Sequence, residues 1–364
     1  MKTVKFMIAA TAILSMATSL TAQESQKLTA NKHNEYGIIY ALPVTHLNIE
    51  VEAVKTIKKA GPYYRYADKY LGVKNPVIKD SETWEIRDVQ ISPVGVPDKE
   101  NEYLMKFKSG SAPFLMLDEN GLPLSINIEP EEAVVKRKRN KMPDKSILDG
   151  TDYASAFTED MIASESMMKR AETTAAKIFE LRESRNDLVS GNADQMPPDG
   201  QSLELMLNEL NRQEQMLTAM FTGTTQTETK VFRVDYVPTK DVDGDVVFRM
   251  SDVNGVVDKN DLSGDPVYIT LKTTEKGELP VNDKGETKKI PNGAVMYTIP
   301  GKANVTLTYH GKTIATENVE VAQFGVAFGL EPKMFTDKKA PAYVIFNPES
   351  GSIKELGTLE IFEE

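Results

Sequence analysis

The sequence of 364 residues contains no cysteine, three histidines and a single tryptophan. A chain without cysteine forms neither disulfides nor thiolate-metal sites, and it offers no N-terminal cysteine for the lipid of a lipoprotein. His33, His46 and His310 lie far apart in the sequence, and none has a second histidine at the spacing of a metal site. We therefore predict that the protein has no metal site and uses no cofactor.

Basic residues are fewer than acidic ones: the sequence has 43 Lys and Arg and 54 Asp and Glu, which gives a formal net charge of -11. A surface of this sign repels phosphate backbones, so we predict no nucleic-acid partner. The apolar share of 40% and the charged share of 27% are ordinary for a folded protein. The length is sufficient for two or three domains.

Long hydrophobic runs are confined to residues 1–22, "MKTVKFMIAATAILSMATSLTA". Two lysines, an apolar stretch and then small residues are the plan of a secretory signal peptide. The apolar stretch is shorter than the roughly 20 residues that a membrane-spanning helix needs. We expect residues 1–22 to be removed, residues 23–35 to form a flexible N-terminus, and the mature protein to have no transmembrane segment. It would be periplasmic or associated with the outer membrane.

Two stretches more than two hundred residues apart share one plan. They are "SAPFLMLDENGLPLSIN" at 111–127 and "KAPAYVIFNPESGSIKEL" at 339–356. Each has Ala-Pro, a short apolar run, a polar turn that ends in glycine, and a second run with apolar residues at alternate positions. Gly121 and Gly351 supply the residue that takes a positive φ in each turn. Both stretches are therefore predicted to be β-hairpins.

The resemblance continues upstream of both hairpins in the same order. "TWEIRDVQISPVGV" from Thr83 matches "TIATENVEVAQFGV" from Thr313 and aligns Gly95 with Gly325, and "YALPVTHLNIEV" matches "YTIPGKANVTLTY". We interpret residues 36–129 and 228–362 as two related antiparallel β-sandwich-like units. The aligned glycines should then occupy equivalent strand breaks. The alternative is that the two segments reached the same turn chemistry independently.

Between these units the hydrophobic period changes from two to about 3.6, which predicts a helical hairpin at 151–223 after a linker at 130–150. The first stripe comprises Tyr153, Phe157, Met161, Met168, Ala171, Ala175, Ile178 and Leu181, and the second comprises Leu203, Met206, Leu207, Leu210, Leu217, Met220 and Phe221. The predicted class is therefore α+β. The frequent methionines suit either a core or an adaptable surface for a partner.

Several longer stretches resemble one known family. They include "LRESRNDLVSG", "PDGQSLELMLNELNRQEQMLTAMFTG", "FRMSDVNGVVDKNDLSGDPVYI" and "YALPVTHLNIEVEA". The sequence is similar to the exported proteins of Bacteroides-type bacteria that contain domain of unknown function 4831. The resemblance covers most of the chain outside residues 1–22. It implies an envelope location and brings no activity, ligand or catalytic residue.

The stretch "GPYYRYADKYLG" predicts a short helix at 62–71, with Pro62 in its first turn. Tyr63, Tyr66 and Tyr70 then share one face, and aromatic faces with polar tips suit contacts to carbohydrate or peptide. These three tyrosines and Trp84 are the candidate ligand-binding residues. In the alternative interpretation the tyrosines pack onto the β-sheet, where Trp84 receives them.

Two charged stretches allow a binding role beside a plain structural one. Asp241, Asp243 and Asp245 in "DVDGDVVF" resemble the start of a calcium loop, but the glycine and the final glutamate of that loop are out of place, so a solvated turn is favoured. The basic run "KRKRNK" at 136–141 lies in the predicted linker. It is interpreted as a solvated segment or as a contact for an acidic partner or lipid headgroups.

The scarcity of nucleophile and metal-ligand patterns favours a protein that is not an enzyme and acts as a binding, scaffold or assembly component of the cell envelope. Its expected partner is an envelope protein or a glycan. The alternative is a hydrolase that acts on glycan through two loop carboxylates. Because the chain contains 54 carboxylate residues, the sequence does not identify a catalytic pair.

Overall fold

The computed structural model describes residues 37–106, 114–130, 157–163, 166–337 and 339–359. The predicted signal peptide, N-terminus and basic run, most of the linker, and Tyr153 lie outside these residues. The described residues form an α+β protein dominated by antiparallel strands, as the sequence predicts. The elements are β1 (Gly37–Lys59), η1 (Tyr64–Tyr66), α1 (Ala67–Leu71), β2 (Ser81–Lys106), β3 (Leu115–Leu117), β4 (Pro123–Ile126), α2 (Glu159–Ala163), α3 (Met167–Ser190), α4 (Gly200–Thr222), β5 (Thr224–Tyr236), β6 (Val242–Ser251), β7 (Gly255–Val257), β8 (Asp265–Glu275), β9 (Val295–Tyr309), β10 (Lys312–Leu330), η3 (Pro332–Thr336), β11 (Ala342–Phe346) and β12 (Ile353–Thr358).

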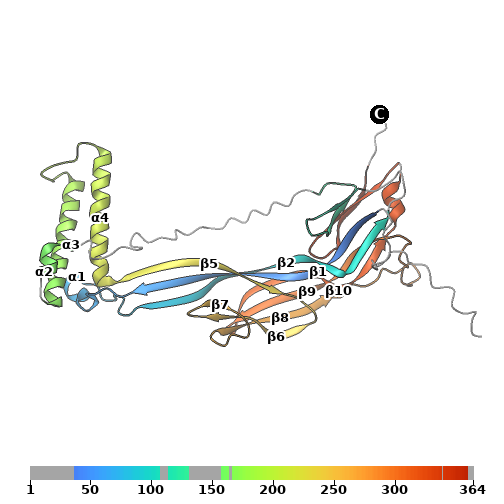
Figure 1. Cartoon of the computed structure of the whole chain (residues 1–364), viewed down its shortest axis with the longest axis horizontal. Helices are drawn as coiled ribbons and strands as arrows, with labels where there is room; N and C mark the ends of the chain where they lie inside the picture. The colour runs from blue at the N-terminus through green and yellow to red at the C-terminus, as the bar shows by residue number, and fades with distance from the viewer. Residues whose placement is uncertain (1–36, 107–113, 131–156, 164–165, 338, 360–364) are drawn as a thin grey trace, which may run out of the picture.

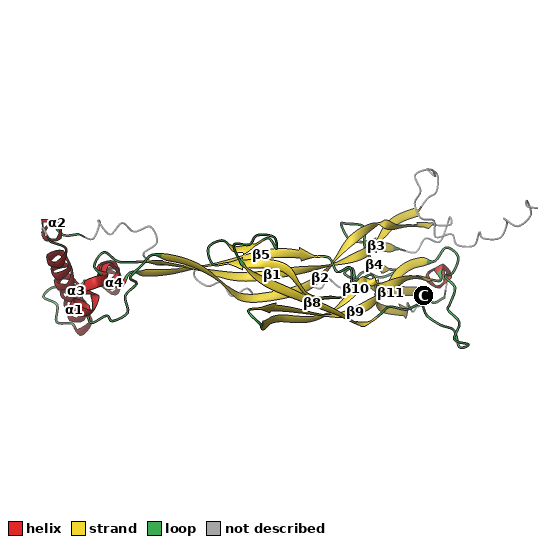
Figure 2. Cartoon of the chain, turned by 90° about the horizontal axis from the view of Figure 1, so that it is seen from below, coloured by secondary structure: helices red, strands yellow, loops and turns green. Residues whose placement is uncertain are grey.

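The strands form three antiparallel sheets in an elongated molecule (Figure 1). The strand orders are β2-β1-β5, β10-β9-β8-β6-β7 and β12-β11-β4-β3. We call the first sheet the arm, because Figure 2 shows its strands running along much of the molecule, with the helices at one end and the third sheet at the other. At about 3.3 Å per residue, the 23 residues of β1 span about 75 Å.

The main hydrophobic core lies between the arm and the second sheet. Leu47, Ile49 and Val51 of β1 are fully buried, and they share one cluster with Ile269 of β8 and Val305 of β9. Alternate residues of β1 therefore face the second sheet, as the period of two predicts. Beyond Ala53 the arm extends past this core, and the side chains of β1 there are half-buried or exposed.

Ion pairs link neighbouring strands along the arm. Lys55 Nζ lies 2.7 Å from Glu82 Oε2, Arg87 lies 3.2 Å from Glu52, and Arg233 Nε lies 3.0 Å from Glu50 Oε1. Each pair joins β1 to β2 or to β5. Such cross-strand pairs contribute modestly, about 0.2–1 kcal/mol each, so backbone hydrogen bonding and the core supply most of the arm's stability.

Strands from both predicted β units share sheets. The hairpins β3–β4 and β11–β12 join through the pairing of Ile126 with Val344, and β5 pairs with β1 from Leu47 to Lys59. Asn127 strengthens the junction of the hairpins, since its side-chain amide donates to the carbonyl oxygens of Phe335 and Ala342. A two-stranded hairpin is marginal by itself, and combining two of them gives a four-stranded sheet with a buried face.

The aligned glycines divide into one pair that matches and one that does not. Gly121 and Gly351 both lie in hairpin turns with positive φ, +89° and +68°. Gly95 and Gly325 do not occupy equivalent strand breaks, so that prediction is wrong. Gly95 pairs with Thr45 in an unbroken ladder, whereas Gly325 lies in the irregular segment between Val321 and Val326. Close packing explains Gly95, because an added Cβ would lie 1.9 Å from the carbonyl oxygen of Pro348.

Most residues of the predicted stripes are buried or half-buried, but the first predicted helix is present as two, α2 and α3. The Ser166 side chain accepts a hydrogen bond from the Lys169 backbone at the start of α3, and α3 ends at Gly191 in the left-handed conformation. Asp199 caps α4 through Ser202. The methionines divide between the two interpretations given above: Met161, Met216 and Met220 are buried, whereas Met167, Met168 and Met206 are exposed.

The stripe on α4 becomes more buried toward its C-terminus. Leu217 is buried, whereas Leu203, Leu207 and Leu210 are half-buried. We expect Leu207→Asp to lower the free energy of unfolding by about 1–3 kcal/mol, because the new carboxylate loses part of its hydration. The matched control is Leu205→Asp, at a position 71% exposed, where a change within about 0.5 kcal/mol is expected. Urea unfolding of both variants measures the difference, and equal values would contradict the packing of Leu207.

Candidate functional site

The end of the arm is fastened to the end of α4 through backbone hydrogen bonds. The last carbonyls of a helix have no partner within the helix. Here the backbone N–H of Tyr63 donates to the carbonyl of Met220 at 2.8 Å, and that of Val77 donates to the carbonyl of Thr222 at 2.8 Å. An added Cβ at Gly61 would lie 2.2 Å from the Met220 carbonyl oxygen. The connection between β1 and β2 therefore lies directly against α4.

The three predicted tyrosines pack against the helical hairpin formed by α3 and α4. Tyr63 is 3% exposed, and its ring centroid lies 5.4 Å from that of Phe221. Tyr66 and Tyr70 are partly buried against the same cluster, with ring centroids 6.1 Å apart. The short helix predicted at 62–71 is present as η1 followed by α1. These rings cover the apolar residues of α3 and α4 near the arm.

Trp84 belongs to a different hydrophobic cluster. Its ring meets Phe232 edge-on at 5.7 Å, beside Ala53 and Met250. The structure thus does not bring Trp84 to the tyrosines, either as part of one ligand site or as the partner that receives them. The reason is tertiary, because α3 and α4 supply the apolar surface that covers the tyrosines. Ligand contact by the tyrosines alone stays a prediction.

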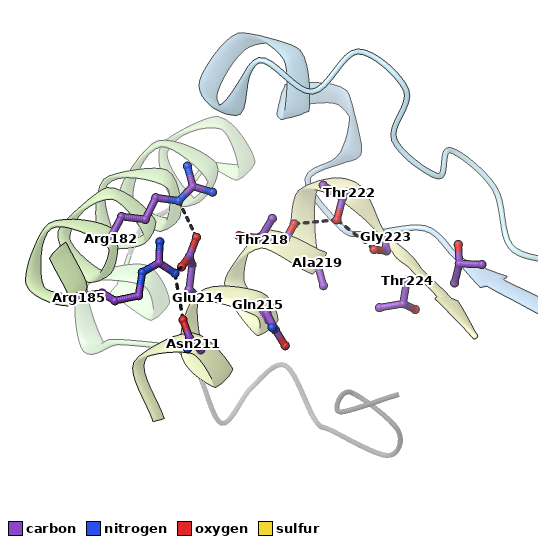
Figure 3. Close-up of a pocket in the computed structure, with 11 residues that line it drawn as sticks. Arg182, Arg185, Asn211, Glu214, Gln215, Thr218, Ala219, Thr222, Gly223 and Thr224 are labelled. Atoms are coloured by element: carbon purple, nitrogen blue, oxygen red, sulfur yellow. Dashed lines mark hydrogen bonds and ion pairs between the residues drawn. The ribbon is translucent and has the colours of Figure 1, made fainter. Parts of the chain in front are cut away.

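A groove of about 490 Å³ lies where the helical hairpin meets β5 (Figure 3). Glu214 is 14% exposed and binds two guanidinium groups, Arg182 Nε at 2.6 Å and Arg185 Nη1 at 2.5 Å. Arg185 Nη1 also donates to Asn211 Oδ1 at 3.0 Å. Two cations against one carboxylate leave this wall of the groove with a net positive charge, in a protein that is negative as a whole.

The opposite part of the groove is lined with threonines. They are Thr218 and Thr222 of α4 and Thr224 and Thr225 of β5. The Thr222 hydroxyl donates to the carbonyls of Thr218 and Gly223, whereas Thr218 Oγ1 is buried without a hydrogen-bond partner among the described residues. An unpaired buried hydroxyl costs about 1–3 kcal/mol. The groove therefore offers both cationic and hydroxyl hydrogen-bonding groups.

Sequence reasoning missed this groove, although a signal was present. Arg182 and Arg185 are three residues apart on α3, and Asn211 and Glu214 are three residues apart on α4. Residues at this spacing share a helix face. In an antiparallel helical hairpin two such pairs can meet, but the register of the helices decides whether they do.

A second groove, of about 560 Å³, lies beside the turn between β9 and β10. The ring of His310 stacks on Tyr309 at 3.9 Å, and His310 Nε2 lies 3.0 Å from Asp265 Oδ2. Glu85, Asp88 and Asp252 also line this groove. His46 has a separate partner, Asp235, at 2.9 Å. In the part of the chain that the structure describes, no three histidine or acidic side chains are placed to hold a metal ion.

The candidate calcium stretch lies at the start of β6. The Asp241 carboxylate accepts hydrogen bonds from the Thr273 backbone and hydroxyl, and these bonds lower the pKa of Asp241. Asp243 and Asp245 are within β6, and the ladder shifts between them at Gly244, whose φ is +83°. The three carboxylates therefore belong to a bulged strand and its hydrogen-bonded entry, and Asp241 has a structural partner.

Five exposed carboxylates in the described part of the chain have a shifted pKa, and in each of them the pKa is lowered. The Arg212 and Gln213 side chains lower the pKa of Glu209 to about 2. Hydrogen bonds from nearby backbone or hydroxyl groups lower the pKa of Asp199, Asp241, Asp261 and Asp337. A glycosidase needs one carboxyl group with a raised pKa as its general acid. These carboxylates are therefore tuned for capping and ion pairing.

A family model for domain of unknown function 4831 matches residues 36–354. The chain belongs to this family. The match confirms the resemblance inferred from the helical and strand motifs, and it covers the described helices and strands from β1 to β11 and the first two residues of β12. Neither the curated proteins nor the solved structures contain a match to the chain. Among the described residues, no helix has the length and apolar character needed to cross a membrane.

Proposed function

We propose that the protein is an exported component of the cell envelope that binds a partner and acts as a scaffold or assembly factor. The observation that carries this proposal is a set of exposed apolar side chains on the part of the helical hairpin that lies away from the long arm. Val189, Met196, Leu205 and Met206 are between 45% and 71% exposed. We call these four residues the apolar tip.

The positions of the helices place the apolar tip far from the arm. α4 ends at the arm, and Figure 1 shows α3 and α4 running in opposite directions, joined at the ends away from the arm. The C-terminus of α3, the N-terminus of α4 and the loop between them are therefore at the free end of the helical hairpin, as Figure 1 shows. Large apolar side chains grouped on a surface are typical of sites for partner proteins.

The same observations favour binding over hydrolysis of glycan. In the groove at the base of the helical hairpin, Glu214 is the one acidic residue among the described residues that line it, and its carboxylate is engaged by two arginines. A hydrolase needs two carboxylates about 5 to 9 Å apart, one of them available to donate a proton. The periplasmic or outer-membrane location rests on the signal-peptide pattern of residues 1–22.

We also propose that the two β units arose by internal duplication and pack as sandwich-like layers with the helical hairpin inserted between them. The pairing of β1 with β2 and that of β9 with β10 support this duplication. In each pair, the strand register shifts next to the matched motif, which is YALP in β1 and YTIP in β9. Between Ala41 and Pro43, β1 advances two residues (43 − 41) while β2 advances five (102 − 97). Between Gly301 and Ile299, β9 advances two (301 − 299) while β10 advances five (326 − 321).

The binding proposal is tested by removing the apolar tip. The variant carries Val189→Ser and Leu205→Ser, and the matched control carries Val253→Ser and Leu262→Ser, at positions 70% and 81% exposed elsewhere. Each protein is cross-linked to the isolated envelope fraction, and the products are identified by mass spectrometry. We expect the wild type and the control to be cross-linked to the same partner. The amount of that partner cross-linked to the tip variant should be at least tenfold lower.

Two results would contradict the proposal. One is equal capture of the same partner by the tip variant and the control pair. The other is release of new reducing ends when the purified protein is incubated with envelope polysaccharide, because turnover of that kind is the alternative function. Unfolding curves of both double variants exclude a general loss of structure, since substitutions at exposed positions usually change stability by less than about 0.5 kcal/mol.

A further inference from the structure

Among the residues that the structure describes, no strand pairs with the outer edge of β5. In the strand order β2-β1-β5, β5 is the edge strand among the described residues, and all thirteen of its residues pair with β1 without a register shift. In an antiparallel ladder, alternate residues direct their N–H and C=O groups away from the paired strand. β5 therefore presents a regular row of backbone donors and acceptors on its outer side.

Two of the usual means of protecting a sheet edge are absent from β5, although the strand does carry charged side chains. Proteins block edges with proline, bulges, very short strands or charged residues. The opposite edge strand of the same sheet, β2, contains Pro93 and Pro97 and two irregularities in its pairing with β1. β5 contains neither proline nor bulge from Thr224 to Tyr236. The two edges of the arm thus differ, and β5 is the one suited to accept another strand.

We propose that β5 pairs antiparallel with β5 of a second copy of this chain about a two-fold axis at Thr229. In an antiparallel pair, two residues that face each other either both hydrogen-bond across the pair or both do not. This condition is met only when the two-fold axis passes through a residue that faces its own copy, and not when it passes between two residues. An axis at Thr229 pairs residues 224–234 of one copy with the same residues of the other. The arm then becomes a continuous six-stranded sheet across the two copies.

Charge complementarity selects Thr229 over its neighbours. With the axis there, Glu228 of each copy lies opposite Lys230 of the other, and both side chains are exposed. An axis at Glu228 or Lys230 would place like charges face to face, which is destabilising. An axis at Val231 would place both charges opposite apolar side chains. Opposite charges directly across a strand pair are favourable, and this register provides two such pairs.

The groove at the base of the helical hairpin gives a second match of charge. In the same register, Asp235 of the second copy lies opposite Gly223, and Gly223 lines the groove that contains Arg182 and Arg185. An acidic side chain would thus arrive beside the positively charged wall described above. This inference does not depend on what the apolar tip binds, because β5 and the tip lie at opposite ends of α4.

The absence of cysteine makes a direct test available. In the proposed register the two Thr229 residues face each other, with Cα atoms about 4.5–5.5 Å apart, which a disulfide can span. Two copies of Thr227 would be four residues apart along the strands, about 13 Å, which is too far. We expect Thr229→Cys to form a disulfide-linked dimer on mild oxidation, and the matched control Thr227→Cys to remain a monomer on a non-reducing gel.

Charge reversal tests the register independently. Lys230→Glu or Glu228→Lys alone creates two like-charge pairs, whereas the double variant restores both opposite-charge pairs. Sedimentation equilibrium is expected to show a dimer for the wild type, a dimer dissociation constant at least fivefold larger for each single variant, and a return toward the wild-type constant in the double variant. The proposal would be overturned if the wild type were still a monomer at about 100 µM, near the highest concentration of the assay. Equal cross-linking at positions 227 and 229, or a double variant no better than the singles, would also overturn it.

Discussion

Replacement of Phe221 by alanine is expected to lower the free energy of unfolding by about 3–5 kcal/mol. Phe221 is fully buried at the end of α4, where its ring contacts that of Tyr63 from the β1–β2 connection. The substitution leaves a cavity between the arm and the helical hairpin, and the surrounding backbone cannot close it, because Tyr63 and Val77 are hydrogen-bonded to α4. Urea unfolding of the purified protein measures the change.

The matched control for this substitution is Phe179→Ala on α3. Phe179 is 51% exposed, so a change of about 0.5 kcal/mol or less is expected. The two substitutions are chemically the same and differ mainly in burial, although the Arg182 guanidinium also lies 5.5 Å from the centre of the Phe179 ring. If the two variants had the same free energy of unfolding, Phe221 would not be the residue that fastens the helices to the arm.

Gly95→Ala is expected to destabilise the protein by about 3 kcal/mol or more. The ideal Cβ position at Gly95 lies 1.9 Å from the carbonyl oxygen of Pro348, and that oxygen belongs to the backbone of the turn between β11 and β12. A backbone atom cannot rotate aside as a flexible side chain would. Either β2 or the hairpin turn must therefore shift, which disturbs the contact between the arm and the third sheet.

Gly200→Ala serves as the control for this prediction. Gly200 begins α4, and an added Cβ would meet no atom within 4 Å. Alanine favours the helix over glycine by up to about 1 kcal/mol, so this variant should be as stable as the wild type or slightly more stable. Thermal unfolding of both variants distinguishes the cases. A Gly95→Ala protein with an unchanged melting temperature would show that Pro348 does not pack against β2.

Most local elements could be predicted from the pattern of residues along the chain. The change of hydrophobic period from two to 3.6 marked α3 and α4, because a helix buries one stripe and a strand buries alternate residues. Ser166, Gly191 and Gly223 lie at helix ends, where capping geometry favours these residue types. Gly121 and Gly351 fixed two hairpin turns in the same way, since a positive φ is costly for other residues.

Only the tertiary structure decided which elements meet. Backbone hydrogen bonding is the same for every residue, so the sequence did not show that β4 would pair with β11 or that β5 would join β1. Trp84 and the tyrosines share aromatic character, but different surfaces cover them. The groove of Arg182, Arg185 and Glu214 depends on the register of α3 against α4. Side-chain chemistry is local, whereas contact depends on how distant segments pack.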